Sequence, residues 1–501
     1  NPDHASATMP RVVGDTESTV AAWEGSQSIP RPRSFLGAVE ARLQAADSEA
    51  ILVDSTSDGG ATDREMAELV QGWSTALRRA GVGPGDLVPV ALDRGTPFVA
   101  VMFAVLGLGA GFVPLDPLAP DDRVRRMLEI LGASVGVKAR GRVMPGNSMT
   151  WIASPSSIEP SCPVLDRFAC PDPDDVAFVL FTSGSTGTPR GVRLSHRNFD
   201  QYLEVVAEAI RPNAYEGSAW TSSVAFDSSV AEILYPVVHG GRVVVLERVD
   251  LGSAASLSRA LLARKITGFG CATALWSAWM KYVAGLDDPI PGTLRHVDIG
   301  GSVADPGLVR RWLEMTGSKV DLMNRYGPTE ASVTVTAHRI DADSLRTASI
   351  PIGRPERGTE IRILDEAQRR VPPGVEGEIW IGGGQVALGY LGTGDDQGGF
   401  QALAGAEGRW FRTGDRGVWN ADGEILFGGR ADDQVKVGGF RVELDEVREA
   451  IKRIDDQYEI EVLMIGESTE ARLGVVVEMD SNEDEIDAWR TEMRVRLESV
   501  L

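Results

Sequence analysis

The clearest chemical signal in the sequence is a segment rich in glycine and hydroxyl side chains, FTSGSTGTPRG at 181–191. Glycines allow a backbone to approach a phosphate closely, while hydroxyls and amides donate hydrogen bonds to its oxygens. The spacing is not that of a Walker A loop, because no G-x-x-x-x-G-K-[ST] pattern is present. Composition alone leaves two interpretations open, a phosphate-binding loop and a Gly/Ser-rich surface loop.

The elements around this segment are those that such a loop requires. The apolar VAFVLF at 176–181 predicts a buried strand, and SHRNFDQYLEVVAEAI at 195–210 predicts a helix with Ser195 as its N-cap. Earlier in the chain, helical patterns (SFLGAVEARLQ, EMAELVQGWSTALRRAGV) alternate with strand patterns (AILVDS, DLVPVAL). This alternation indicates an α/β fold with mostly parallel sheets flanked by helices.

The C-terminal part of the chain has a different pattern. The short strands EIRILD, GEIWIGG and GEILFGG predict a smaller β-rich lobe between about 350 and 430. From about 433, the helix LDEVREAIKRI, the strand EIEVLMIG and a helix starting near Asp484 predict a small α+β lobe. We therefore expect an irregular N-terminal linker at 1–35, an N-terminal core at 36–431 and a C-terminal lobe at 432–501.

Composition limits the possible partners and location. The net charge of −22 should repel a polyanion, so nucleic acid is not expected as a partner. Cys162, Cys170 and Cys271 form no C-x-x-C pair, and the five histidines show no ligand spacing, so we expect no zinc site and a reducing cytoplasm.

The polar start predicts no secretory signal, and an initial Asn suggests excision from a longer chain. The apolar stretch 98–115 is broken by glycines and Pro114, so we expect a buried helix and strand and no membrane span.

Several ordered motifs resemble those of the acyl-adenylate-forming enzymes, over residues from about 36 to the end. They are FTSGSTGTPRGV, GLGAGFVPLDP at 107–117, NRYGPTE at 324–330, GEIWIGGGQVALGYL at 377–391 and FRTGDRGVWNADGEILFGGRADDQVKVGGFRVELDEVREAI at 411–451. The resemblance implies that a substrate carboxylate attacks the α-phosphate of ATP, so cations and oriented donors must screen two anions.

The resemblance implies a role for each matching position. Thr329 would donate to the α-phosphate, Glu330 would hold a Mg²⁺ ion, and Arg190 stands where a lysine is usual, which changes a point charge into a planar fork. Tyr326 would stack on the adenine, Asp415 would accept the ribose hydroxyls, and Arg430 would support the ribose side. The full set implied for the nucleotide is Thr182, Ser183, Gly184, Ser185, Thr186, Gly187, Gly301, Tyr326, Asp415 and Arg430.

Two further features concern the C-terminal lobe. Asp432 resembles the hinge residue about which that lobe rotates between an adenylate-forming and a thioester-forming arrangement, and a short polar turn suits such a change. The family carries a catalytic lysine in a Gly-Lys context, and the sequence stops at Leu501 before such a motif, so we expect an incomplete lobe.

Asp227, in the segment FDSSV, favours one branch of the family. In amino-acid-activating members an aspartate here pairs with the substrate α-ammonium, so the resemblance implies an adenylation domain of a nonribosomal peptide synthetase. Such a domain passes its product to the 4'-phosphopantetheine thiol of a carrier domain and works beside a condensation domain. A stand-alone acyl- or aryl-CoA ligase and a non-catalytic nucleotide-binding relative are the alternatives.

The family's substrate-specificity positions fall on Asp227, Ser228, Ala231, Ala274, Asp298, Gly300, Arg325, Val333 and Thr334. The small residues among them suggest a large pocket. Asp298 and Arg325 either pair with each other or meet a polar group that both donates and accepts. The second alternative suits a long neutral side chain such as N5-acyl-N5-hydroxyornithine, and therefore a siderophore synthetase.

Overall fold

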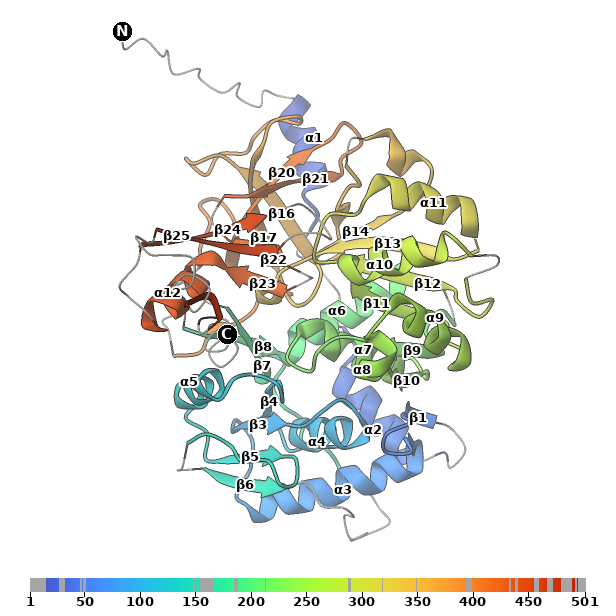
Figure 1. Cartoon of the computed structure of the whole chain (residues 1–501), viewed down its shortest axis with the longest axis vertical. Helices are drawn as coiled ribbons and strands as arrows, with labels where there is room; N and C mark the ends of the chain where they lie inside the picture. Colours follow the sequence, from blue (N-terminus) through green and yellow to red (C-terminus); the bar gives the residue numbers. More distant parts are fainter. Residues whose placement is uncertain are drawn as a thin grey trace.

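The computed structural model describes most of the chain, in a series of segments. These are residues 15–26, 32–45, 47, 51–146, 149–153, 166–183, 188–211, 213–286, 290–317, 319–347, 349–392, 399–431, 434–437, 440–454, 459–465, 472–478, 489–491 and 493. Three larger sheets and two hairpins account for the strands of this part (Figure 1). Within it, no helix is both long and apolar enough to cross a membrane.

A seven-stranded sheet carries the glycine-rich segment. Its order is β18 (Gly389–Tyr390), β8 (Arg190–Ser195), β7 (Val176–Thr182), β4 (Gly111–Pro114), β3 (Leu87–Ala91), β5 (Val135–Lys138) and β6 (Thr150–Ala153). The strands from β7 to β6 are parallel, whereas β8 returns antiparallel to β7 with Thr182 opposite Arg190. The described ends of the glycine-rich segment, 181–183 and 188–191, therefore lie where β7 ends and β8 begins.

A nine-stranded sheet forms the second half of the core. Its order is β15 (Arg354–Pro355), β14 (Thr336–Arg339), β13 (Asp321–Tyr326), β12 (His296–Gly300), β11 (Gly268–Ala272), β9 (Gly217–Trp220), β10 (Arg242–Val245), β1 (Ile51–Asp54) and β2 (Ala61–Thr62). The inner strands from β13 to β1 are parallel, and the strands at both edges are antiparallel. Both large sheets thus have the mostly parallel pairing that the alternating pattern predicts.

The third sheet is antiparallel and belongs to the β-rich region. It contains β16 (Thr359–Leu364), β17 (Gly377–Gly383), β20 (Trp410–Trp419), β19 (Phe400–Gln401) and β21 (Ile425–Arg430). Two hairpins follow it, β22 (Gln434–Val437) with β23 (Phe440–Glu443), and β24 (Glu459–Ile465) with β25 (Arg472–Glu478). Helix α12 (Leu444–Ile454) packs on β24 through a hydrophobic cluster of its own, which includes Val447, Ile451 and Val462.

The helices pack on and between the sheets. They are α1 (Asp15–Trp23), α2 (Phe35–Ala45), α3 (Asp63–Arg79), α4 (Thr96–Gly107), α5 (Asp121–Leu131), α6 (His196–Ala209), α7 (Asp227–Val238), α8 (Arg248–Leu251), α9 (Ala254–Ala263), α10 (Thr273–Val283) and α11 (Pro306–Thr316), with 3₁₀ turns η1 (Thr329–Ala331) and η2 (Asp343–Arg346). Helix α2 contacts α3, α4, α6 and α7. One hydrophobic cluster includes buried residues of all three sheets, such as Phe178, Trp220 and Ile379, so these sheets share a continuous core.

Most expected elements are confirmed, and one expectation is wrong. Helix α6 begins after Ser195, its N-cap as the sequence predicts, and the Ser195 hydroxyl accepts from the backbone amide of Asn198 in a capping box. The expected irregular character of residues 1–35 is wrong for 15–23, which form α1. This helix is held by tertiary contacts, because the rings of Trp23 and Trp419 lie 6.0 Å apart and buried Glu24 pairs with Arg370 at 2.6 Å.

Candidate functional site

A cavity of about 510 Å³ lies where the carboxyl ends of β9, β11, β12 and β13 meet the turn after β7. Ligands in open α/β sheets bind outside the carboxyl ends of parallel strands, so this is the expected place for a site. Among its lining residues are the following that the sequence indicated: Thr182, Ser183, Asp227, Ser228, Ala231, Asp298, Gly300, Gly301, Arg325, Tyr326, Thr329, Val333, Thr334, Asp415 and Arg430.

At one end of the cavity, three residues from distant motifs share hydrogen bonds. The hydroxyl of Tyr326 donates to Oδ2 of Asp415 at 2.6 Å, and the guanidinium of Arg430 donates to Oδ1 at 2.7 Å. Burial, together with the adjacent carboxylate of Asp415, raises the pKa of Tyr326 well above its ordinary value, so Tyr326 remains a proton donor. Each carboxylate oxygen can accept more than one hydrogen bond, which leaves Asp415 able to accept from a bound ligand as well.

The turn after β13 brings a second group of motif residues to the cavity. Thr329 lines the cavity at the start of η1, whereas the next residue, Glu330, is completely buried and accepts a 2.7 Å hydrogen bond from the Tyr390 hydroxyl. The guanidinium of Arg190 lies over the ring of Tyr390, 5.4 Å from its centre. Tyr390 therefore connects Arg190, at the start of β8, with Glu330.

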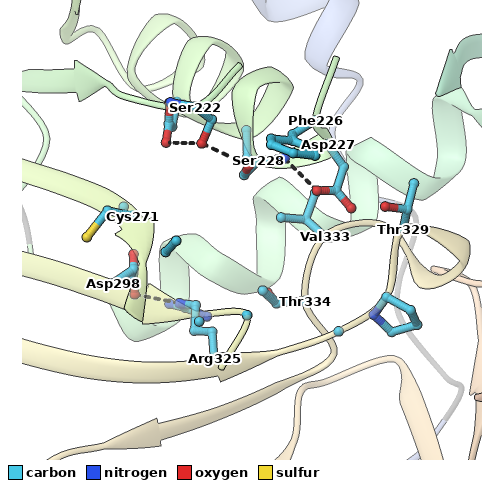
Figure 2. Close-up of a pocket in the computed structure, with 18 of the residues that line it drawn as sticks. Ser222, Phe226, Asp227, Ser228, Cys271, Asp298, Arg325, Thr329, Val333 and Thr334 are labelled. Carbon is cyan, nitrogen blue, oxygen red and sulfur yellow. Dashed lines mark hydrogen bonds and ion pairs between the residues drawn. The ribbon is translucent and has the colours of Figure 1, made fainter. Parts of the chain in front are cut away.

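Asp227 is the first residue of α7 and lines the cavity (Figure 2). Its Oδ1 accepts the backbone amide of Ser228 at 2.7 Å, and a carboxylate at a helix N-terminus is favoured by the helix dipole. Figure 2 shows its carboxylate between Val333 and Thr329. Asp227 therefore lines the same cavity as Thr329, the residue that the sequence assigns to the α-phosphate.

Asp298 and Arg325 pair with each other, which was one of the two alternatives left open by the sequence. Arg325 Nε lies 2.6 Å from Asp298 Oδ1, and its NH1 lies 2.5 Å from Glu356 Oε1 (Figure 2 shows the first pair). The Tyr215 hydroxyl donates to Asp298 Oδ2 at 2.6 Å, and His296 Nε2 lies 3.1 Å from Oδ1.

These contacts decide the charge state of the cluster. Burial by itself would raise the pKa of Asp298, but the charge of Arg325, with the contacts from His296 and the Tyr215 hydroxyl, outweighs it and holds that pKa well below its ordinary value. Burial likewise acts to lower the pKa of Arg325, and the neighbouring carboxylates Asp298 and Glu356 raise it overall. The arginine and the aspartate are therefore both charged, and they largely neutralise each other.

The backbone conformation near this cluster restricts which residue types can occupy several of its positions. A Cβ on Gly300 would lie 2.7 Å from the carbonyl oxygen of Arg325, so the close pairing of β12 and β13 requires glycine there. Gly301 has a φ of +84°, and Val333, which lines the cavity, has a φ of +74°. A positive φ is unfavourable for a β-branched residue, and such strain is found mostly at functional sites.

The structure differs from the sequence interpretation at one wall. Ala274 lies inside α10 and is not among the residues that line the cavity; Gly270, Cys271 and Ala272, at the carboxyl end of β11, take its place. Sequence reasoning also missed Tyr215, Glu232 and Glu356, which come from elements far from the motifs. Position at the carboxyl end of a predicted parallel strand was the available signal for the β11 residues.

Some predicted residues lie outside the described part of the chain. They are Gly184, Ser185, Thr186 and Gly187 of the glycine-rich segment and the hinge residue Asp432. Among the described residues, no group of three or more His, Cys, Asp or Glu side chains is arranged to hold a metal ion.

Comparisons with known proteins agree with this architecture and site. The sequence pattern described as "AMP-binding enzyme" matches residues 39–391. The chain therefore belongs to the AMP-binding enzyme family. Within this family it is an adenylating enzyme of the nonribosomal peptide synthetase type.

Individual relatives illustrate both the similarity and its extent. The chain is 34% identical over 450 residues to CymA of Salinispora arenicola (strain CNS-205), described as a probable nonribosomal peptide synthetase, and 32% identical over 407 residues to enterobactin synthase component F of Escherichia coli (strain K12). These matches cover 87% and 78% of the chain but only 6% and 31% of the relatives. The fold matches NpsA-ThdA, an artificially fused adenylation–PCP di-domain from Klebsiella oxytoca, with a TM-score of 0.82 at 21% identity, covering 94% of this chain and 92% of that one.

Proposed function

We propose that the chain activates a specific amino acid with ATP, forming an aminoacyl-adenylate and pyrophosphate. The observation that carries this proposal is that Asp227 lines the same cavity as Thr329 and Tyr326. An amino acid held there by its α-ammonium would present its carboxylate beside a nucleotide held by Tyr326 and its neighbours. Bringing the carboxylate and the α-phosphate together in this way removes much of the entropic barrier to the reaction.

On the nucleotide side, we assign binding to the Tyr326, Asp415 and Arg430 cluster. Membership of the AMP-binding family supports adenine nucleotide as the ligand, and the hydrogen-bonded carboxylate of Asp415 is suited to ribose hydroxyls. Thr182 and Ser183, at the end of β7, add hydroxyls that suit phosphate oxygens. Arg190 and Thr329 would stabilise the negative charge that develops at the α-phosphate.

Mg²⁺ is the metal that this chemistry implies, and Glu330 is the residue that would hold it. Mg²⁺ in nucleotide sites is held by one or two carboxylates together with phosphate oxygens and water. Glu330 is completely buried and is not among the residues that line the cavity, so its carboxylate would have to become accessible to bind the ion. Its buried position and the hydrogen bond from Tyr390 fix the direction of that carboxylate. When bound, the ion would neutralise phosphate charge.

The acceptor and the domain movement are part of the same proposal. The chain covers a small share of its synthetase relatives, and we propose that a carrier domain with 4'-phosphopantetheine takes the aminoacyl group, with a condensation domain nearby. The separate hydrophobic cluster of α12, β24 and β25 supports a C-terminal lobe at 432–501 that moves relative to a core at 36–431, with Asp432 as the hinge and 1–35 as the preceding linker. We propose a cytoplasmic location for this work.

For the substrate we propose an amino acid with a large, partly polar side chain, of which N5-acyl-N5-hydroxyornithine in siderophore synthesis is one candidate. The small residues Ala231, Gly270 and Gly300 at the cavity support a side chain of some size. Mutual pairing of Asp298 and Arg325 weakens the case for a charged side chain and is compatible with a neutral polar one.

ATP–pyrophosphate exchange measured with a panel of amino acids, fatty acids and aryl acids tests the proposal. We expect exchange with one or a few amino acids and none with the other acids. Exchange with fatty or aryl acids alone would favour a CoA ligase, and ATP binding without any exchange in a full-length chain that includes the Gly-Lys segment would favour a non-catalytic relative.

A further inference from the structure

One wall of the cavity contains a chain of hydrogen bonds that ends on a buried carboxylate. The Ser228 hydroxyl donates to the Ser222 hydroxyl at 2.9 Å, and the Ser222 hydroxyl donates to Glu232 Oε1 at 2.8 Å (Figure 2 shows Ser222 and Ser228). All three residues line the cavity, and none of them belongs to the nucleotide cluster. We call these residues the serine relay.

Glu232 determines which way the hydroxyl hydrogens of the serine relay point. Its Oε2 accepts the backbone amides of Thr221 and Ser222 at 2.8 and 3.0 Å, and its Oε1 accepts from the hydroxyls of the same two residues. An ionised carboxylate has no proton to donate, so the Ser222 hydrogen must point toward it. Burial raises the pKa of Glu232 to about 7, against the lowering effect of these hydrogen bonds, so Glu232 is mostly ionised at pH 8.

The orientation of the Ser222 hydroxyl in turn fixes the orientation of the Ser228 hydroxyl. Because the Ser222 hydrogen is used on Glu232, Ser222 can only accept from Ser228, and the Ser228 hydrogen points away from a ligand. What Ser228 offers to the cavity is its lone pairs. A ligand group that meets Ser228 must therefore donate a hydrogen bond, since two acceptors facing each other would leave buried polar groups unpaired.

The other polar side chains of the cavity limit the charge of that ligand. Asp298 already receives hydrogen bonds from Arg325 and Tyr215, and Arg325 also reaches Glu356. A cationic side chain would have to displace Arg325, and an anionic one would have to displace Asp298. Neither displacement is favourable for a pair in which removal of one partner leaves a buried charge.

We propose that the serine relay selects a neutral amino acid whose side chain carries an O–H or N–H donor, and that Ser228 Oγ accepts this hydrogen bond. Ser222 and Glu232 act as positioning residues that fix the Ser228 hydrogen away from the substrate. The inference rests on the proposed amino-acid activation and adds the class of side chain.

The test compares amino acids that differ in one donor, with dissociation constants measured by calorimetry at pH 8 in the presence of a non-hydrolysable ATP analogue. Suitable pairs are Thr and Val, Tyr and Phe, and a hydroxamate-bearing ornithine and its O-methyl ether. For the pair that fits the cavity, the donor-bearing member should bind about tenfold or more tightly. Ser228→Ala should reduce this ratio to near one and leave the donor-lacking member and the ATP analogue unaffected.

Two further variants separate the relay from a structural effect. Ser228→Thr retains the hydroxyl and should restore the preference for the donor. Ser222→Ala leaves the Ser228 hydrogen free to turn toward the substrate, so the preference should fall, and the double variant with Ser228→Ala should show the same ratio near one as Ser228→Ala alone.

Each contrary result has a distinct meaning. The serine relay does not determine the preference for a side-chain donor if that preference is unchanged in Ser228→Ala. The same conclusion follows if both members of a pair lose affinity equally. The second of these results would place Ser228 at the α-ammonium. If no amino acid binds to the unaltered chain and none supports pyrophosphate exchange in a full-length chain that includes the Gly-Lys segment, the proposed function itself fails, and the inference fails with it.

Discussion

Arg325 Nε lies 2.6 Å from Oδ1 of Asp298, in a pair whose side chains are only 4% and 16% exposed. The same guanidinium also bonds Glu356, so one arginine holds two carboxylates against the strands that carry the cavity. Removal of Arg325 would leave both carboxylates without their cation, whereas removal of Asp298 leaves Arg325 paired with Glu356.

We therefore predict that Arg325→Ala lowers the free energy of unfolding by about 3–5 kcal/mol, and that Asp298→Ala lowers it by less, because Arg325 keeps its pair with Glu356. Urea denaturation of each variant measures this quantity. Asp174→Ala is the control, because the pair of Asp174 and Arg197 is largely exposed and its loss should cost at most about 1 kcal/mol. Equal losses in the buried and the exposed pair would show that the buried network does not stabilise the fold.

The second prediction concerns the α-ammonium. Asp227→Ala should remove detectable amino acid binding, because an enclosed ammonium without its partner costs about 3–5 kcal/mol, while the affinity for ATP stays nearly unchanged. Calorimetric titration with the amino acid and separately with ATP measures both affinities. A fall in ATP affinity as large as the fall for the amino acid would argue against the assignment of Asp227.

The third prediction concerns the nucleotide. Asp415→Asn keeps the shape of the side chain but removes the charge, and hydrogen bonds to charged groups are roughly twice as strong as neutral ones. We expect ATP affinity to fall by about tenfold with little change in amino acid affinity. Asp422→Asn, at an exposed turn of the same sheet, is the matched control. If both variants bind ATP equally well, Asp415 does not contact the ribose.

The fourth prediction is a pH dependence of stability. Burial lowers the pKa of His196 to about 4, and the ring stacks on Phe35 at 5.4 Å. A base whose pKa is depressed in the folded state contributes full stability above its unfolded pKa of about 6.5, and this contribution is lost as the pH falls toward 4. The loss should approach about 3 kcal/mol.

Comparison with His196→Phe isolates this contribution from other groups. Asp200, one turn along α6, has a pKa raised to about 7 by burial, and it titrates in the opposite direction, gaining stability as the pH falls. Asp200 is present in both proteins, so the difference in unfolding free energy between them should report His196. If that difference stays constant from pH 7 to 4, the assignment of the shift to His196 is wrong.

Much of the fold follows from local patterns in the sequence. The N-cap of α6 is predictable because Ser195 and Asn198 satisfy each other three residues apart. Helix α1 could not be predicted in the same way, because its position depends on Trp419 and Arg370, which lie far along the chain. Tertiary packing decides whether such a short helix forms, because its own sequence cannot stabilise it alone.

The residues of the candidate site can likewise be divided into those that a local sequence motif predicts and those that only the folded structure reveals. Tyr326, Asp415 and Arg430 were found because each sits in a contiguous motif, and the structure brings them together. Glu232 and Glu356 stand in no such motif, and their importance appears only when folded strands place them beside Ser222 and Arg325. Ala274 illustrates the opposite case, where counting along the sequence gave a position inside α10 in place of the end of β11.

The attachment of α1 has a mechanical consequence. The backbone oxygen of Glu24 accepts from the Ile361 amide, its side chain pairs with Arg370, and Gly25 bridges to Glu360, so these three contacts all end on or beside β16. A load applied to the chain ahead of α1 would be received by the small antiparallel sheet. The two large sheets that carry most of the cavity would bear the load only after this attachment had ruptured.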